Sequence, residues 1–308
     1  MMVYVVKRIL GMIPTLALLM TLVFFTLRLA PGGPFDTDRK LPPEIELNIQ
    51  VRYGLNRSLP AQFATWAKDV LQGDLGESFQ YTGRPVLEII GQSLPVSFTV
   101  GVLALLVAIA IGIPLGVVAA AKRGTFWDSS AMFLAVSGVS LPSYLTASAL
   151  VLVFSLKLGW LPPALWEDWQ SAILPILTLA LRPLAVIARL VRASMIESLH
   201  ADYVRTAFAK GLSSRPVLFK HALKNSLLPV ITLLGPLAAN LVTGSFLVEM
   251  VFQIPGMGKH FVNAVINRDY PMVMGVTLVY GLILSLSNLG VDVLNAWVDP
   301  RIRLEEHG

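Results

Sequence analysis

Residues 95–121 read PVSFTVGVLALLVAIAIGIPLGVVAAA and contain no charged side chain. A run of this length exceeds the roughly 20 residues that a helix needs to cross the hydrocarbon core of a bilayer. The bilayer interior offers no water to hydrogen-bond a free backbone N–H or C=O, so a run exposed to lipid must be helical. The stretch therefore predicts an all-α integral membrane protein.

The rest of the chain repeats this pattern. Hydrophobic residues make up 55% of the 308 residues and charged residues only 14%, whereas soluble domains carry about 25% charged residues. We expect six transmembrane helices, each centred on an apolar run. The expected spans are residues 9–30, 95–121, 131–156, 171–191, 227–251 and 272–297.

The basic residues predict the orientation of these spans. With the N-terminus inside, the cytoplasmic segments carry thirteen lysines and arginines, and the two short outside loops carry three. Cytoplasmic loops are enriched in Lys and Arg, so we expect both termini to be cytoplasmic. The net charge of +5 is spread over the ends of apolar runs rather than gathered in a tail, which argues against nucleic acid as a partner.

The chain divides into three expected parts. Residues 1–30 form an N-terminal transmembrane helix, which we interpret as a retained signal-anchor because its apolar run is too long for a cleaved signal. Residues 31–94 form an external region with short helices over 44–53 and 61–71. Residues 95–308 form a five-helix core that includes a cytoplasmic loop over residues 193–226.

Several classes of function lack their sequence signals. There is no cysteine, hence no disulfide and no thiolate metal site. No phosphate-binding loop or hydrolase motif occurs, so we predict no catalytic, cofactor-binding or metal-binding residue in this chain. The first five spans also lack a central Asp or Glu, which argues against a secondary transporter driven by an ion gradient.

The cytoplasmic loop has the strongest functional pattern: ASMIESLHADYVRTAFAKGLSSRPVLFKHALKNSLLP, residues 193–229. We expect Asp202 to cap a short helix that Gly211 ends in a left-handed conformation, and Pro216 to open a second helix. Four positions of the first helix are spaced to share one face, namely Val204, Ala207, Phe208 and Gly211.

A helix this short is unstable alone in water, so its apolar face needs a partner surface. Two partners fit the periodicity. The helix either lies on membrane lipid headgroups, which its basic residues favour, or couples this chain to a second protein that moves it.

The loop resembles that of importer-type ABC permeases in the peptide and nickel branch. The resemblance is carried by DYVRTAFAKGL and HALKNSLLP, and LPPEIELNI is similar to the B-type subunit of oligopeptide permeases. Other segments extend it over essentially the whole chain: RILGMIPTLALLMTLVFFTLRLAPGGPFD, YGLNRSLPAQF, GDLGESF, TGSFLVEMVFQIPGMG, NRDYPMVMG and VDPRIR.

This resemblance implies a type I ABC importer permease fold in a bacterial inner membrane. It implies four partners: a second homologous permease subunit, two cytoplasmic ATPase subunits that bind ATP and Mg, and an external peptide-binding protein. The implied function is inward transport of oligopeptides or dipeptides. A permease for nickel or another small solute stays open as the alternative, because this fold also hosts such substrates.

The resemblance also implies which residues contact the ATPase. One departure limits it: the general importer consensus begins with Glu-Ala-Ala, and Arg205-Thr206-Ala207 stands in that region here, so a contact through glutamate is not expected. The implied coupling residues are Asp202, Arg205, Ala207, Ala209, Lys210, Gly211, Leu212, His221 and Pro229.

Three polar residues within expected spans are candidates for the translocation pathway. Arg182, in the middle of a span, either meets a peptide carboxylate or serves as a structural ion pair beside Pro183. Glu249, near the outer end of its span, either attracts a peptide amino terminus or is a solvated helix end. Asn288 either faces the pathway or hydrogen-bonds a neighbouring helix.

Overall fold

The structure is a computed structural model that describes residues 2–35 and 43–298. Regular secondary structure in this part of the chain is helical, apart from one isolated bridge between Glu77 and Pro85. The all-α prediction is therefore confirmed for the described residues.

Five helical segments are long and apolar enough to cross a membrane. Each coincides with one of the six runs expected from the sequence. They lie in α1 (Met2–Leu29), α4 (Val86–Ala121), α7 (Trp169–His200), α11 (Leu228–Val242) together with α12 (Phe246–Val251), and α14 (Tyr270–Val298).

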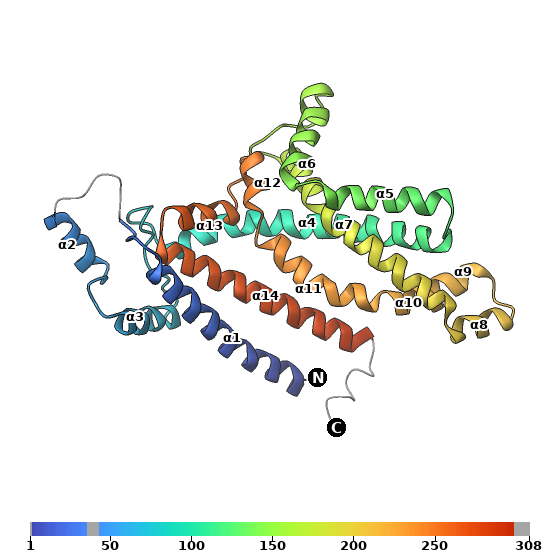
Figure 1. The fold of residues 1–308 in the computed structure, drawn as a ribbon, viewed down its shortest axis with the longest axis horizontal. Helices are drawn as coiled ribbons and strands as arrows, with labels where there is room; N and C mark the ends of the chain where they lie inside the picture. The colour runs from blue at the N-terminus through green and yellow to red at the C-terminus, as the bar shows by residue number, and fades with distance from the viewer. Residues whose placement is uncertain (1, 36–42, 299–308) are drawn as a thin grey trace.

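The remaining run, residues 131–156, does not form one continuous helix. It is divided among α5 (Phe126–Ser140), α6 (Ser143–Leu150) and the π-helical stretch η1 (Val151–Lys157). Pro142 causes the break: proline disfavours a helical conformation in the residue before it, and Leu141 is extended, with φ −89° and ψ 132°. Figure 1 shows α6 leaving the direction of α5 and projecting from the bundle.

The centre of the bundle is the pair α4 and α7, which are in contact over much of their length. Glycines of α4 make this close approach possible. A Cβ atom at Gly112 would lie 2.9 Å from the carbonyl oxygen of Leu184, and one at Gly116 would lie 2.6 Å from that of Ala188. Small residues let helix backbones approach in this way within membranes.

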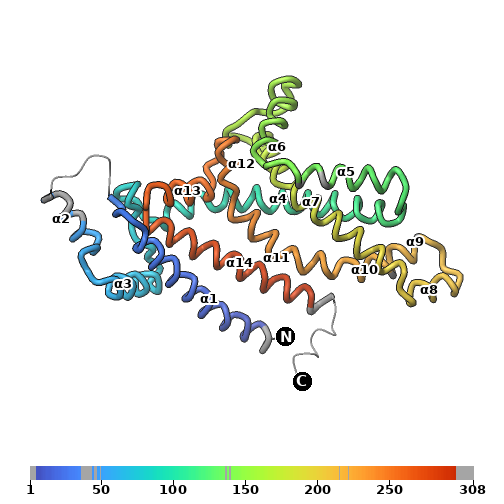
Figure 2. The backbone as a smooth tube through the Cα atoms, viewed as in Figure 1, coloured from blue at the N-terminus to red at the C-terminus, as the bar shows by residue number. Residues whose placement is uncertain are grey.

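Short helices gather at the two ends of the bundle (Figures 1 and 2). At one end lie α2 (Pro43–Arg52) and α3 (Leu59–Leu71), which confirm the two short helices expected over residues 44–53 and 61–71. The beginning of α1 lies beside the end of α14, away from α2 and α3. The opposite end of the bundle carries α8 (Asp202–Ala209), α9 (Ser214–Pro216), η2 (Val217–Ala222) and α10 (Leu223–Ser226).

Two adjacent residues join the α3 end to the bundle. Asp269, fully buried before α14, accepts hydrogen bonds from the Ser78 hydroxyl and from the Phe79 N–H at 3.1 Å. The Arg268 side chain donates to the Gly33 carbonyl at 3.2 Å. These bonds hold both the turn after α1 and the loop before α4 against the start of α14, beside α13 (Met257–Ile266).

Candidate coupling surface and transport-pathway residues

The start of α8 differs from the sequence prediction. The helix begins at Asp202 itself, Ala201 is the N-cap, and no side chain caps the helix. The prediction that Asp202 caps α8 is therefore wrong. Asp202 Oδ1 instead lies 3.6 Å from Nη1 of Arg205, and both side chains are mostly exposed, so this ion pair contributes little to stability.

The end of α8 matches the prediction. Gly211 has a φ of +80°, its N–H donates to the Phe208 carbonyl at 2.9 Å, and the Leu212 N–H donates to the Ala207 carbonyl at 3.3 Å. This is the Schellman arrangement, in which a left-handed residue closes a helix. The chain direction after α8 is thus fixed by the backbone of one glycine.

The two faces of α8 have opposite environments. Val204 and Ala207 are buried in a cluster with Met195 of α7 and Val217 of η2. Phe208 is 46% exposed and Gly211 is also exposed, so only two of the four residues expected to share one face are buried within the chain. We call six of the exposed residues the α8 outer face: Tyr203, Arg205, Phe208, Ala209, Lys210 and Leu212.

The α8 helix is attached to two long helices. The cluster beneath it continues through Ala222 to Val230 of α11. The Ser226 hydroxyl also donates to Ser198 Oγ of α7 at 3.0 Å. Pro229 is exposed in the first turn of α11, where a missing N–H is tolerated; His221 lies in η2, and its side chain falls outside the described part of the structure.

An ion pair near this end fixes the loop between α4 and α5. Nε and Nη2 of Arg192 in α7 donate to the two carboxylate oxygens of Asp128 at 2.6 and 2.8 Å. The Gly124 N–H also donates to Asp128, at 3.0 Å. The hydrogen bonds from Arg192 are the main reason that the pKa of Asp128 is lowered to about 2.

We expect Asp128→Asn to destabilise the chain by about 2 kcal/mol at pH 7, because a hydrogen-bonded charge is lost. The lowered pKa means that this stabilisation is complete above the unfolded pKa of about 3.9 and disappears as the pH falls through about 2. The unfolding temperatures of wild type and variant in detergent should therefore converge between pH 4 and pH 2. Asp202→Asn, at the exposed pair, is the control and should change little; a pH-independent difference for Asp128→Asn would contradict the account.

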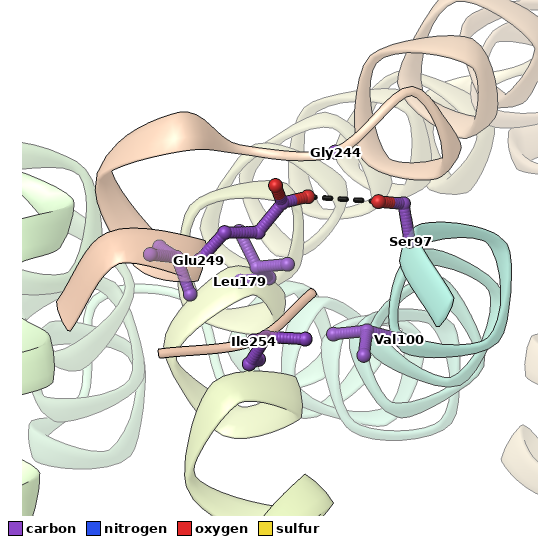
Figure 3. Close-up of a pocket in the computed structure, with 7 residues that line it drawn as sticks. Ser97, Val100, Leu179, Gly244, Glu249 and Ile254 are labelled. Atoms are coloured by element: carbon purple, nitrogen blue, oxygen red, sulfur yellow. Dashed lines mark hydrogen bonds between the residues drawn. The ribbon is translucent and has the colours of Figure 1, made fainter. Parts of the chain in front are cut away.

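Glu249 is buried rather than solvated, with 4% of its surface exposed. Its Oε1 accepts from the Ser97 hydroxyl of α4 at 2.8 Å, and its Oε2 accepts from the Lys259 N–H at 2.8 Å. It also accepts from the Gly258 N–H. The carboxylate therefore caps α13 and joins it to α4, as Figure 3 shows for the bond to Ser97.

The space beside Glu249 is too small for a peptide. The cavity measures about 10 Å³, near the lower limit for a single water. A Cβ atom at Gly244 or Gly256 would collide with the carboxyl group. In this conformation Glu249 is a packing and capping group, with no room for a substrate.

The other two pathway candidates lie in different surroundings. Arg182 is exposed in the middle of α7 and makes no ion pair or side-chain hydrogen bond within residues 2–35 and 43–298. Asn288 of α14 lies against Gly235 of α11 and lines a cavity of about 280 Å³ between α1 and α14. The candidates thus do not form a single cluster.

Sequence reasoning missed the residues that hold these elements together. Ser97 and Glu249 are 152 residues apart, and Asp128 and Arg192 are 64 apart. The one available signal was a polar or charged residue inside or directly beside an apolar run, since such groups are costly unless they are paired.

Known proteins match nearly the entire chain. Residues 112–304 match the family described as "Binding-protein-dependent transport system inner membrane component". The oligopeptide transport system permease protein OppB of Salmonella typhimurium is 44% identical, over 98% of this chain and 100% of that protein. OppB of Haemophilus influenzae is 43% identical over the same shares, and the dipeptide transport system permease protein DppB of Bacillus subtilis is 41% identical over 99% of both chains. The chain therefore belongs to the family of binding-protein-dependent transport system inner membrane components.

Proposed function

We propose that this chain is a transmembrane permease subunit of an ATP-binding cassette importer that moves oligopeptides or dipeptides inward across the inner membrane. The observation that carries this proposal is the full-length identity of 41–44% to permease proteins of oligopeptide and dipeptide transport systems. The chain is not catalytic by itself, and the energy for transport enters through other subunits.

The proposed topology has six crossings with both termini in the cytoplasm. The five long segments account for five of them, and the broken unit α5, α6 and η1 supplies the third crossing in chain order. The lysine and arginine bias supports this orientation. It puts residues 31–94 outside, α8 inside, and the five-helix core over residues 95–308.

Four partners complete the proposed importer. A second homologous permease forms the other half of the pore, two ATPase subunits bind ATP and Mg in the cytoplasm, and an external binding protein delivers the peptide. The α8 outer face is the proposed contact with one ATPase. Its aromatic and aliphatic side chains are exposed although the helix is firmly attached below them, which favours a protein partner over an isolated surface helix.

The attachment of α8 suggests how movement is transmitted. Its buried face belongs to one core cluster with residues of α7 and α11, and packed interiors transmit displacement because they contain few voids. An ATPase that changes conformation on binding nucleotide would displace α8, α7 and α11 together. Such a subunit shifts the pore between two states only if it binds those states with different affinity.

Arg182 is the residue that we propose faces the pathway or the second permease. An arginine at membrane depth is costly unless a partner or an aqueous cavity receives it, and the described residues supply no ion-pair partner. Glu249 and Asn288 have contacts within the chain, so their proposed roles are to position α13 and to pack α14 against α11.

The test is ATP-driven uptake into vesicles that contain the assembled importer. We expect labelled di- and oligopeptides to accumulate with ATP and not with a non-hydrolysable analogue. Nickel uptake is the alternative, and the described residues contain no group of three His, Cys, Asp or Glu suited to a metal ion. Peptide uptake without ATP hydrolysis, or uptake of nickel alone, would overturn the proposal.

A further inference from the structure

A third cavity lies at the proposed external end of the chain. It measures about 300 Å³ and is bounded by α2, α3, the end of α1 and the loop before α4. Ligand cavities begin at about this volume. Tyr53, Trp66 and Phe79 supply aromatic walls. Six charged residues also line it: Arg28, Arg52, Arg57, Asp69, Asp74 and Glu77.

Neighbouring groups engage three of these six charges. Arg52 Nη2 lies 3.8 Å from Glu77 Oε2. Asp74 Oδ1 accepts from the Gly76 N–H at 2.8 Å. These three residues line the cavity, and each of their charged groups has an ion-pair or hydrogen-bond partner within the chain.

The other three charges have no opposite charge within ion-pair distance among the described residues. Arg28 is oriented all the same: its Nε donates to Gln62 Oε1 at 2.9 Å, and its guanidinium lies 3.4 Å from the centre of the Phe24 ring. Those contacts fix its geometry without neutralising it. Arg57 and Asp69 likewise face the cavity without an ion-pair partner.

The positions of Gln62 and Asp69 on α3 indicate how long a ligand between Arg28 and Asp69 can be. Gln62, which holds Arg28, and Asp69 are seven residues apart on one face of α3, which corresponds to about 10 Å along the helix. An extended dipeptide spans about 7 Å, and a hydrogen bond of about 2.8 Å at each end brings the total to about 13 Å. A dipeptide is therefore long enough to reach from Asp69 to the group that Gln62 holds, which is Arg28.

We propose that this cavity binds the free termini of a short peptide on the outer side of the membrane. The peptide carboxylate lies at Arg28, where the guanidinium offers a bidentate contact, and Arg57 adds positive charge. The peptide ammonium lies at Asp69. This inference rests on the proposed function, since it names a step at which a delivered peptide is held before the pathway opens.

The experiment measures peptide binding to the assembled importer in nanodiscs, without the external binding protein and without ATP. Isothermal titration compares the dipeptide Ala-Phe with its N-acetyl and C-amide derivatives. We expect each derivative to bind at least about tenfold more weakly than Ala-Phe, because each loses a charge-assisted hydrogen bond.

Two variants test which residue binds each end of the peptide. Asp69→Asn should weaken binding of Ala-Phe about tenfold and leave binding of the N-acetyl derivative unchanged. Arg28→Lys should weaken binding of Ala-Phe and leave binding of the C-amide derivative unchanged. The Asp69 side chain makes no ion pair among the described residues, so its variant decides the question even if Arg28→Lys folds poorly.

Glu44→Gln in α2 and Lys68→Gln in α3 are the matched controls, because both side chains are exposed and neither lines the cavity. The inference is overturned if wild type does not bind Ala-Phe, or if Asp69→Asn weakens Ala-Phe and its N-acetyl derivative equally. ATP-driven uptake is measured separately on the same assembly. Uptake of peptide without binding at this cavity would refute the proposed site only, whereas the absence of uptake would refute the proposed function.

Discussion

Gly211→Val should reduce ATP-driven peptide uptake by about tenfold or more while the chain still inserts in the membrane. A side chain with a Cβ branch disfavours the left-handed conformation by about 1–2 kcal/mol or more, and Gly211 has a φ of +80°. A Cβ atom there would have nothing within 4 Å, so the effect comes from the backbone and not from a collision. An eight-residue helix has little stability of its own to absorb that strain.

Gly211→Asn is the matched control, since asparagine adopts the left-handed conformation more readily than valine. The asparagine variant should keep most of the uptake. ATPase activity and uptake are measured together in proteoliposomes, and the valine variant should retain hydrolysis that no longer drives transport. Equal, normal coupling in both variants would show that the end of α8 does not transmit movement.

Glu249→Leu should lower the free energy of unfolding by roughly 3 kcal/mol. The substitution removes the acceptor of the Ser97 hydroxyl and of the Lys259 N–H, and each buried donor left without a partner costs about 1–3 kcal/mol. The α13 helix also loses its cap. Denaturation of the purified chain in detergent, followed by circular dichroism, measures the change.

Glu197→Leu provides the comparison. It replaces glutamate with leucine as Glu249→Leu does, but Glu197 is exposed on α7. It should change the unfolding free energy by less than about 0.5 kcal/mol. Equal stability of wild type and Glu249→Leu would show that the carboxylate does not hold α13 to α4.

Long apolar runs gave most of the fold correctly, because length and the need for internal backbone hydrogen bonds determine spanning helices. The break inside residues 131–156 could not be predicted from the apolar run alone. Pro142 was visible in the sequence, but a proline in an apolar run either kinks a helix or ends it. Only the neighbouring helices decide which, and here α5 ends at Ser140.

The local features of α8 were partly predictable. A glycine after a short helical pattern correctly indicated the left-handed stop at Gly211. The side-chain roles were less predictable. Periodicity alone placed Phe208 with Val204, yet the buried stripe is narrower and excludes Phe208; Asp202 lies one position too late to cap the helix.

Pairs distant in sequence could not be predicted from a single chain. No local pattern connects Ser97 with Glu249 or Asp128 with Arg192, because each pair depends on how long helices pack. The cavity lined by α2 and α3 also depends on packing, because its charged residues come from α1, α2, the turn before α3, α3 itself and the loop before α4.

The absence of cysteine in this chain permits the most direct test of the coupling surface. A single cysteine at Phe208, on the α8 outer face, would carry a short cross-linker in the assembled importer. The account predicts a cross-link to an ATPase subunit with a yield that changes between the nucleotide-free and ATP-bound states. A cysteine at Phe208 that cross-links to no protein and reacts only with lipid-soluble reagents would contradict it.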